Sequence, residues 1–351
     1  MAGTAYAKSA FEYTGVVGAE FSTPTLSTKI LYPAATDFTL GLGANPMERD
    51  DELIGVDEPR SVLPEVYNPT WSTTSRGYPD TLAHLLTGML GAPTTTAGNN
   101  VITDPDGTAI PTGAYRHVFT APFNPVGYYP QTQEWIVAYK DQSVFYRVKG
   151  CATEQMQITV PTTGGVQVQA SGPATYINRI SDPSLTAAPD GLTTPPFQRA
   201  FASVTSWLAS SNITVSCSDI SFTITNPVTA INNFAVASRF PDSMEKDNSS
   251  IMITGTAVAR QMAAADWDAL LAATGFVAQT RWVSTTNITG SYPFKMYIRL
   301  NNAQYVDGAP DSLAAVRRIG GSFNFKGTYA GTAGHAVITI VNDKSSYSTT
   351  A

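Results

Sequence analysis

The sequence contains few charged residues. Only 14% of its 351 residues are Asp, Glu, Lys or Arg, against about 25% in an average globular protein. The formal net charge is −6, and no block of Lys and Arg forms the basic stripe of a nucleic-acid-binding surface. So few charges favour a protein whose surface is partly covered by copies of itself.

Long hydrophobic runs and a disulfide framework are also missing. No stretch of about 20 apolar residues could cross a membrane as a helix. The N-terminal stretch MAGTAYAKSAFEYTGVVGAEF lacks the apolar core of a signal peptide, so we expect the chain to be made and kept in a cytoplasm. Two cysteines, Cys151 and Cys217, are too few for a disulfide scaffold, and we expect both to be reduced and buried.

The motifs of common catalytic and metal sites are absent from the sequence. It contains no GxSxG, GxxxxGK or HExxH pattern. His84, His117 and His335 stand apart, with no second ligand at metal spacing. DPDG at 104–107 resembles the start of a calcium loop, but the later acidic ligands are missing, so we interpret it as a turn. Trp135 is more typical of a core than of a sugar platform. We therefore predict no catalytic residue, no cofactor and no metal.

One turn-like pattern occurs twice in the chain, whose length suggests about two domains. NPVGYYP begins at Asn124 and NITGSYP at Asn287, with Asn, Gly, Tyr and Pro at the same four places. Turns favour these residue types everywhere, so the flanking segments must decide whether the chain is duplicated.

A segment with helical spacing precedes each turn. In YPDTLAHLLTGMLG apolar residues recur at i, i+3, i+4 and i+7, and MAAADWDALLAATG has a similar apolar face. We expect these helices to end at Gly91 and Gly275. We expect them to pack on sheets through Leu82, Leu85, Leu86 and Met89 in the first and Trp267, Leu270 and Leu271 in the second.

Strand-like segments surround both helices in the same order. NPTWSTTSRG and SIMITGTAVARQ precede the helices, and FKMYIRLNNAQYV follows the second turn. In the last segment Lys295, Tyr297 and Arg299 alternate with apolar residues, which is typical of a half-buried strand. We infer a mainly β chain of two tandem related domains, each an α+β or a β-sandwich domain with one short flanking helix. A chance likeness between two unrelated β-rich domains is the alternative.

The inferred duplication divides the chain into five parts. They are an N-terminal arm at 1–20, a first domain at 21–170 with a surface insert at 93–113, a Pro-rich linker at 171–200, a second domain at 201–345, and a C-terminal tail at 346–351. The linker contains five prolines and is interpreted as a semi-rigid spacer, although an ordinary long surface loop would also fit.

Acidic residues are concentrated in ERDDELIGVDEP, residues 48–59. A solvated loop is the simple interpretation of this stretch, and a polar contact arm toward a neighbouring subunit is the functional one. The connection around it is long for a hairpin turn, and such long connections are usually functional or disordered. The candidate contact residues are Glu48, Asp50, Asp51, Glu52, Ile54, Val56, Asp57 and Glu58.

Two segments resemble bacteriophage major tail tube proteins. GAEFSTPTLSTKILYPAATDFTLGL is similar to the extended arm and first strand of that family, and PDTLAHLLTGMLGAP to its helix, which ends in a Leu-Gly pair. The resemblance covers residues 11–92 and, more weakly, 219–343. It implies a β-sandwich tail-tube fold whose sheets join between subunits around a bore, in rings that stack into a tube. Two such domains per chain resemble the double-domain subtype of long non-contractile tails.

The resemblance also implies partners and a location. It implies self-assembly into homotrimeric pseudo-sixfold rings, with tape measure, tail terminator and distal tail proteins as further partners. It implies a virion protein of the phage tail, assembled in the host bacterial cytoplasm, and an acidic stretch that reaches the next ring. We expect Ile54 and Val56 to pack on that neighbour and the carboxylates to meet a basic residue such as Arg317 or Arg318. A mildly acidic chain suits DNA passage without specific binding, because cations on a bore would hold phosphates.

Two other classes of function remain open at this point. A virion surface adhesin or receptor-binding module would place its site on the 93–113 insert. A hydrolase whose carboxylate pair forms only on folding would leave no motif in the sequence.

Overall fold

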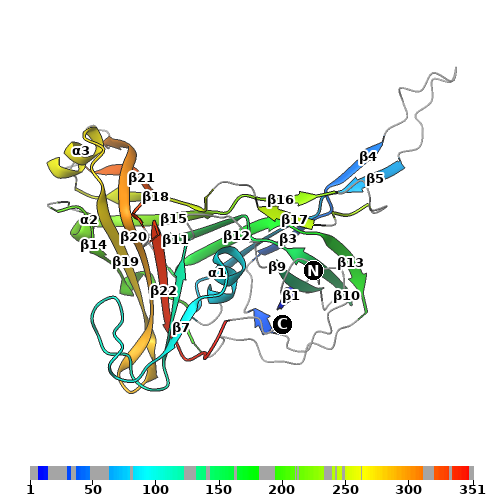
Figure 1. The fold of residues 1–351 in the computed structure, drawn as a ribbon, viewed down its shortest axis with the longest axis horizontal. Coiled ribbons are helices and arrows are strands. Elements are labelled where there is room, and N and C mark those ends of the chain that lie inside the picture. Colours follow the sequence, from blue (N-terminus) through cyan, green and yellow to red (C-terminus); the bar gives the residue numbers. More distant parts are fainter. Residues whose placement is uncertain are drawn as a thin grey trace, which may run out of the picture.

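The chain forms a mainly antiparallel β structure with a few short helices (Figure 1). The computed structural model describes residues 7–14, 30–32, 37–47, 63–79, 82–121, 132–139, 143–161, 164–181, 194–209, 211, 213–232, 239–241, 243–246, 250–261, 263–310, 320–331 and 334–347. None of the helices in these ranges is long and apolar enough to cross a membrane.

One sheet of 13 strands runs through both halves of the chain. Its main path is β3 (Asp37–Gly41), β6 (Thr70–Arg76), β12 (Gln167–Pro173), β11 (Gln155–Val160), β15 (Cys217–Thr225), β18 (Met252–Ala259), β21 (Gly321–Gly327), β20 (Tyr292–Pro310), β22 (Ala336–Asn342), β8 (Tyr115–Thr120) and β7 (Thr94–Ala97). β19 (Phe276–Thr289) pairs with β20, and β14 (Ala202–Ser206) pairs with β19. The long β20 bends from one part of this sheet into another, so the sheet curls back toward itself.

A second sheet of five strands packs on the first half of the large one. Its order is β13 (Tyr176–Ile180), β10 (Val144–Cys151), β9 (Thr132–Tyr139), β1 (Ala7–Thr14) and β2 (Ile30–Tyr32). Trp71 of β6 and Trp135 of β9 meet between the sheets with ring centroids 5.4 Å apart, and Phe38 of β3 lies 5.3 Å from Trp135. Trp135 therefore belongs to the core, as predicted.

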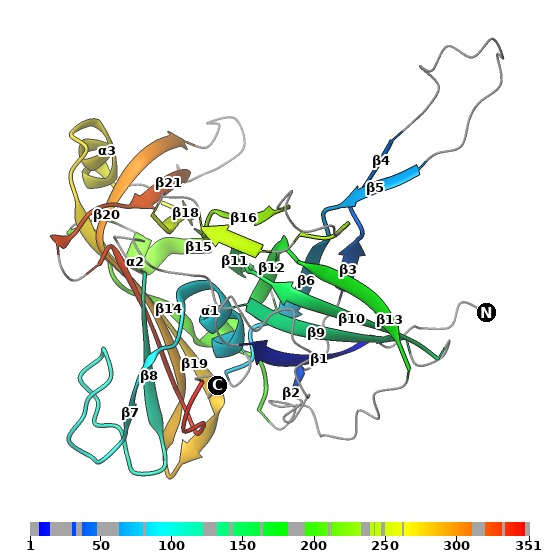
Figure 2. The same ribbon diagram turned by 45° about the vertical axis from the view of Figure 1, so that its right-hand side comes forward.

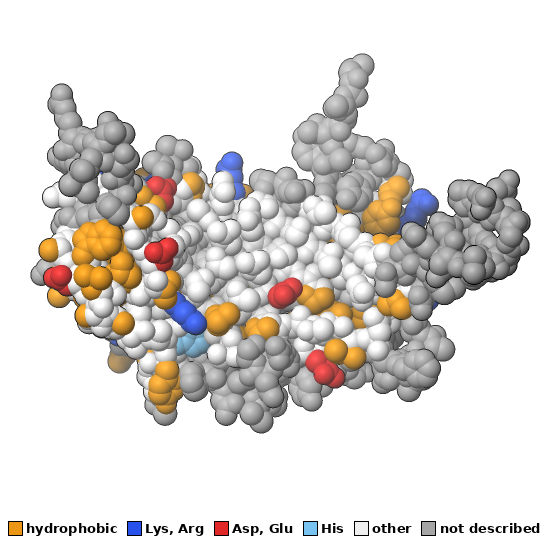
Figure 3. Space-filling view, turned by 90° about the horizontal axis from the view of Figure 1, so that it is seen from above, with side chains coloured by type: hydrophobic (Ala, Val, Ile, Leu, Met, Phe, Trp, Pro, Cys, Tyr) orange, Lys and Arg blue, Asp and Glu red, His pale blue; other side chains and the backbone are white. Residues whose placement is uncertain are grey.

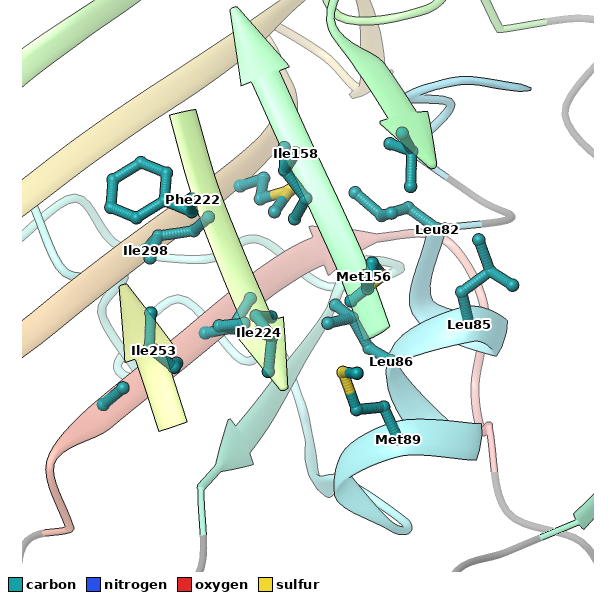
Figure 4. Packing of buried hydrophobic residues seen from close by; sticks show 14 of the residues in the cluster. Leu82, Leu85, Leu86, Met89, Met156, Ile158, Phe222, Ile224, Ile253 and Ile298 are labelled. Carbon is teal, nitrogen blue, oxygen red and sulfur yellow. The ribbon is translucent and has the colours of Figure 1, made fainter. Parts of the chain in front are cut away.

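The first predicted helix is present as α1 (Leu82–Leu90) and lies inside the molecule. All nine of its residues are buried, so it is not the flanking helix that we expected. Leu82, Leu86 and Met89 point toward Met156 and Ile158 of β11 (Figure 4). Gly91 has φ of 86° and donates its N–H to Thr87 O, the left-handed helix end that glycine favours.

The second predicted helix, α3 (Ala264–Leu271), lies at the surface. Its buried residues are Asp266 and Ala269, while Trp267 and Leu270 are half-buried against the core. Leu271 is 83% exposed, so its predicted packing is wrong for the single chain. Asp266 also anchors α3, because it accepts hydrogen bonds from Ser211 Oγ at 2.6 Å and Tyr305 OH at 2.8 Å, a polar contact that the apolar spacing does not reveal. The residue with positive φ after α3 is Ala273, not Gly275.

The same strand order occurs twice along the chain. In the first half β3-β6-β12-β11 lie side by side and β1-β9-β10-β13 pair. In the second half β15-β18-β21-β20 and β14-β19-β20-β22 pair in the corresponding order. Each half also carries a hairpin after its first large-sheet strand, β4 (Ala44–Met47) with β5 (Leu63–Tyr67) and β16 (Val228–Ile231) with β17 (Ser243–Lys246). β11 pairs directly with β15, so the halves share one sheet and are not separate sandwiches.

Two details of the expected repeat differ from this topology. NITGSYP connects β19 to β20, which pair with each other. NPVGYYP lies outside the described residues, between β8 and β9, and β8 pairs with β22 and β7 instead of β9. The turn match therefore does not align equivalent strands, because common turn chemistry produced it.

The first third of the expected linker is mostly strand, since residues 171–173 belong to β12 and residues 176–180 form β13. The short helices α2 (Ile213–Ser216) and η2 (Arg199–Phe201) flank β14 and β15.

Candidate functional site

An uncharged polar surface covers one face of the large sheet. In β6, β11, β12 and β15 every second side chain is buried against the core, and the residues between them face outward, as period-two alternation requires. We name this outward surface the polar sheet face. It consists of Thr39, Ser72, Thr74, Gln155, Gln157, Thr159, Gln167, Gln169, Ser171, Ser221, Thr223, Thr225, Thr254, Thr256, Ser322 and Asn324.

Strand register aligns these residues into continuous rows. Thr74 of β6 lies opposite Gln169, Gln169 opposite Gln157, Gln157 opposite Thr223, and Thr223 opposite Thr254. The row therefore crosses five strands and passes from the first half of the chain to the second without a break. Figure 3 shows the broad, mostly uncharged centre of this face, on the side of the sheet opposite α1.

Among the side chains that the structure describes, charged ones occur only toward the borders of the polar sheet face. Arg76, Asp219, Lys326 and Asp307 occupy outward positions at strand ends or toward the β20 edge. Two are cations and two are anions, so they cancel in number. A duplex gains affinity with each phosphate that a cation neutralises, and the outward positions of the middle strands β12, β11, β15 and β18 carry no Lys or Arg.

The 93–113 insert folds back onto the second half of the chain. Asp104 Oδ2 accepts hydrogen bonds from Lys295 Nζ at 2.6 Å and from Tyr292 OH at 2.7 Å. The side chain of Asp104 is fully buried and that of Lys295 is 9% exposed. Burial acts to raise the pKa of Asp104, but the hydrogen bonds from Lys295, Tyr292 and the Thr108 N–H outweigh it and hold this pKa below its ordinary value.

A second carboxylate completes this contact. Asp106 Oδ2 accepts hydrogen bonds from Tyr297 OH at 2.7 Å and Arg281 Nη1 at 3.0 Å. Burial and the Asp106 bond raise the pKa of Tyr297 above its ordinary value. We name the group Asp104, Asp106, Arg281, Tyr292, Lys295 and Tyr297 the insert clasp. It explains why Lys295 and Tyr297 are buried, against the alternation expected for this strand.

The clasp does not have the properties of a catalytic carboxylate pair. Each of its two aspartates has its own cation, and the Asp104 carboxylate also accepts the N–H groups of Asp106 and Thr108 at 3.0 and 2.9 Å. These bonds make DPDG a turn, as predicted. No group of three His, Cys, Asp or Glu residues that could hold a metal ion occurs in the described ranges.

His84, His117, Cys151 and Cys217 are buried or half-buried residues that pack in the interior. Burial, with a smaller contribution from the Lys344 charge, lowers the pKa of His84 to about 3. His117 Nε2 lies 3.0 Å from Asn342 Oδ1. Cys151 is buried and Cys217 half-buried, both as free thiols, and burial raises the pKa of Cys217 to about 11.

The predicted contact arm begins at a hairpin that leaves the body of the molecule. β4 and β5 extend away from the sheets (Figure 2). The β16–β17 region braces their base, since Tyr67 N donates to Arg239 O at 2.7 Å and the Tyr67 ring lies 5.0 Å from that of Phe240. The acidic residues Glu48, Asp50, Asp51, Glu52, Ile54, Val56, Asp57 and Glu58 and the proposed basic partners Arg317 and Arg318 lie outside the described residues.

The polar sheet face was not recognised in the sequence, although its signal is present. STTS in β6, QMQIT in β11 and QVQAS in β12 all place Ser, Thr or Gln at alternate positions. Only strand pairing shows that these alternate residues fall on one surface.

Comparison with known proteins agrees with this architecture. A search of curated proteins finds no match. A family model described as phage tail tube protein matches residues 67–327, which is about three quarters of the chain and includes both β6 and β21. The matched region contains most of the polar sheet face, α1, the insert clasp and α3. The chain therefore belongs to the phage tail tube protein family, and is a structural component of the phage tail and not an enzyme.

Proposed function

We propose that three copies of this chain form a ring with pseudo-sixfold symmetry, and that rings stack into the tube. The observation that carries the proposal is the β11–β15 pairing, by which the sheet of the first half continues into the sheet of the second half. If each half is one tube domain, this pairing is a domain junction within the chain. Three chains would then supply the six domains of a ring, as in the double-domain subtype.

Equivalent strands identify the junction between chains. β20 beyond Ala303 corresponds to β11, and β3 corresponds to β15, since each has the same neighbours in its half. Both are sheet edges within the described chain, and a heterologous contact between two such edges closes a ring. The pair Gln157 and Thr223 within the chain corresponds to Asp307 of one chain and Thr39 of the next. Such pairing also removes open edges that would otherwise promote aggregation.

The polar sheet face is our candidate for the bore. It would become continuous around the ring when β20 and β3 pair, because its rows already cross the junction between halves. Uncharged hydroxyl and amide groups keep the surface hydrated without holding phosphates. DNA would pass through the bore without specific binding.

The domain bounds, the acidic stretch and the further partners complete the proposed assembly. The repeated strand order favours domains at about residues 7–180 and 202–342 over the boundaries expected from the sequence. β1 and β14 begin the two halves in equivalent places, and β13 and β22 end them in equivalent places. The acidic stretch at 48–59 would contact the next ring, and tape measure, terminator and distal tail proteins would bind the column of rings. These partners follow from the family resemblance alone.

A disulfide experiment tests the proposed ring. Thr39→Cys and Asp307→Cys in one chain place thiols at exposed positions on the two edges. Under mild oxidation we expect covalent species of two and then three chains, with closed trimers as the end product on non-reducing gels, and no ladder from either single variant. A ladder that continues to six chains, or no cross-link in assembled rings, would contradict the ring that we propose.

A further inference from the structure

A positively charged groove lies beside the insert clasp, on the outer side of β8, β19, β20 and β22. It has a volume of about 420 Å³. Arg116 and Arg299 supply its cations, and Thr103, Gln279, Asn301 and Thr339 supply uncharged polar groups. We name it the arginine groove.

The two arginines of the groove lack an anionic partner. Arg116 Nη1 donates to the carbonyl oxygen of Thr103 at 2.8 Å, and Arg299 Nε donates to Asn301 Oδ1 at 3.1 Å. Within the described part of the chain neither is paired with a carboxylate. Asp104 also lines the groove, but its carboxylate is paired with Lys295. The groove therefore has two uncompensated positive charges on a protein whose net charge is −6.

Unsatisfied donors beside the groove are a second, independent observation. The Nε atoms of Arg116 and Arg281 are buried and have no hydrogen-bond acceptor. Buried donors without acceptors cost free energy, and a carboxylate accepts such N–H groups in its most favourable geometry. Both observations point to a ligand with several carboxylates.

We propose that the arginine groove binds the acidic stretch, residues 48–58, of a second copy of this chain. That stretch carries six carboxylates and one arginine, the densest negative charge in the sequence. The inference rests on the self-assembly proposed above and assigns its docking surface to the groove instead of Arg317 and Arg318.

The placement of the two elements favours a contact between chains. β4 and β5, which lead into the acidic stretch, leave the body at the upper right in Figures 1 and 2, whereas β7 and the insert lie at the lower left in both views. The β4–β5 hairpin and the groove lie at opposite ends of one molecule. A contact between them would be head-to-tail, which propagates or closes an assembly.

Charge reversal tests the proposal in the full-length protein. A groove variant carries Arg116→Glu with Arg299→Glu, and an arm variant carries Asp50→Lys, Asp51→Lys and Glu52→Lys. We expect each variant alone to need about a tenfold higher concentration to polymerise at low salt, as loss of two charge pairs implies. At about 1 M salt the difference should vanish, since the screening length falls to about 3 Å.

Mixing the two variants distinguishes a docking contact from a structural defect. The groove of the arm variant is intact and meets the intact arm of the groove variant, and the reversed pair is again complementary. We expect the mixture, and a chain with all five substitutions, to recover polymer length in negative-stain images. Recovery supports the proposal, and absence of recovery with both variants folded by circular dichroism overturns it.

Control variants distinguish this proposal from docking at Arg317 and Arg318 and from binding of DNA in the groove. Arg260→Glu removes an exposed cation outside the groove and should leave assembly unchanged. Arg317→Glu with Arg318→Glu should also leave it unchanged, and a loss restricted to this pair overturns the proposal. A groove variant that assembles normally but no longer retains duplex DNA also overturns the proposal. If the parent chain forms no rings at all, the proposed function fails first, whereas normal rings from the groove variant contradict this inference alone.

Discussion

The helix α1 should be the most sensitive part of the core, and Leu86→Ala tests this directly. Leu86 is fully buried and points to Met156 of β11 (Figure 4). Truncation of this side chain to that of alanine removes apolar contacts and leaves a cavity between α1 and the residues that enclose it. Leucine-to-alanine changes at such sites cost about 3–5 kcal/mol, and the enclosed position of α1 gives little room for collapse. We expect a loss in the free energy of unfolding in this range, measured by urea denaturation of the unassembled chain.

Leu271→Ala is the matched control for this change. Leu271 occupies the corresponding apolar pattern in the second helix but is 83% exposed, so truncation changes folded and unfolded states almost equally. We expect a change below about 0.5 kcal/mol, the usual range for surface substitutions. Similar losses for both variants would refute the distinction drawn here between an enclosed helix and a surface helix.

Three further changes have defined outcomes. Asp104→Ala should lower the free energy of unfolding by about 3 kcal/mol, because it leaves the buried charge of Lys295 without its partner; an unchanged urea midpoint would show that the insert clasp is dispensable. The pKa of His84 is about 3 in the folded chain, below its unfolded value of about 6.5, so stability is full above pH 6.5 and falls toward pH 3 as only the unfolded state binds the proton. His84→Gln should flatten this fall in urea midpoints measured against pH, and an equal slope would contradict it. Gln157→Cys on the polar sheet face should react in assembled tubes with small maleimides but not with those on long polymers, whereas Val101→Cys at the exposed insert should react with both; equal access of the large reagent to both positions would exclude Gln157 from a bore.

Local patterns in the sequence predicted many of the elements. Helical spacing identified α1 and α3, and alternation identified β6, β18 and β20, because these signals lie within one element. Gly91 predicted the end of α1 because glycine readily adopts the left-handed conformation in which helices commonly end.

Features that depend on long-range pairing could not be predicted in this way. The alternating pattern of the strand predicts that Lys295 and Tyr297 are exposed, yet Asp104 and Asp106, each 191 positions away in the sequence, cover them. The exposure of Leu271 depends on which face of α3 the buried Asp266 anchors. The repeated turn suggested a duplication, but the two turns do not connect equivalent strands. The repeated strand order is separate support for the duplication.

The mass of a single isolated ring tests the central claim most directly. Each chain has a mass of 37.3 kDa. If each chain supplies two of six domains, native mass measurement of rings should give three chains, and class averages should show six similar lobes with threefold symmetry. Six chains per ring, or six lobes that are identical by strict sixfold symmetry, would contradict the account.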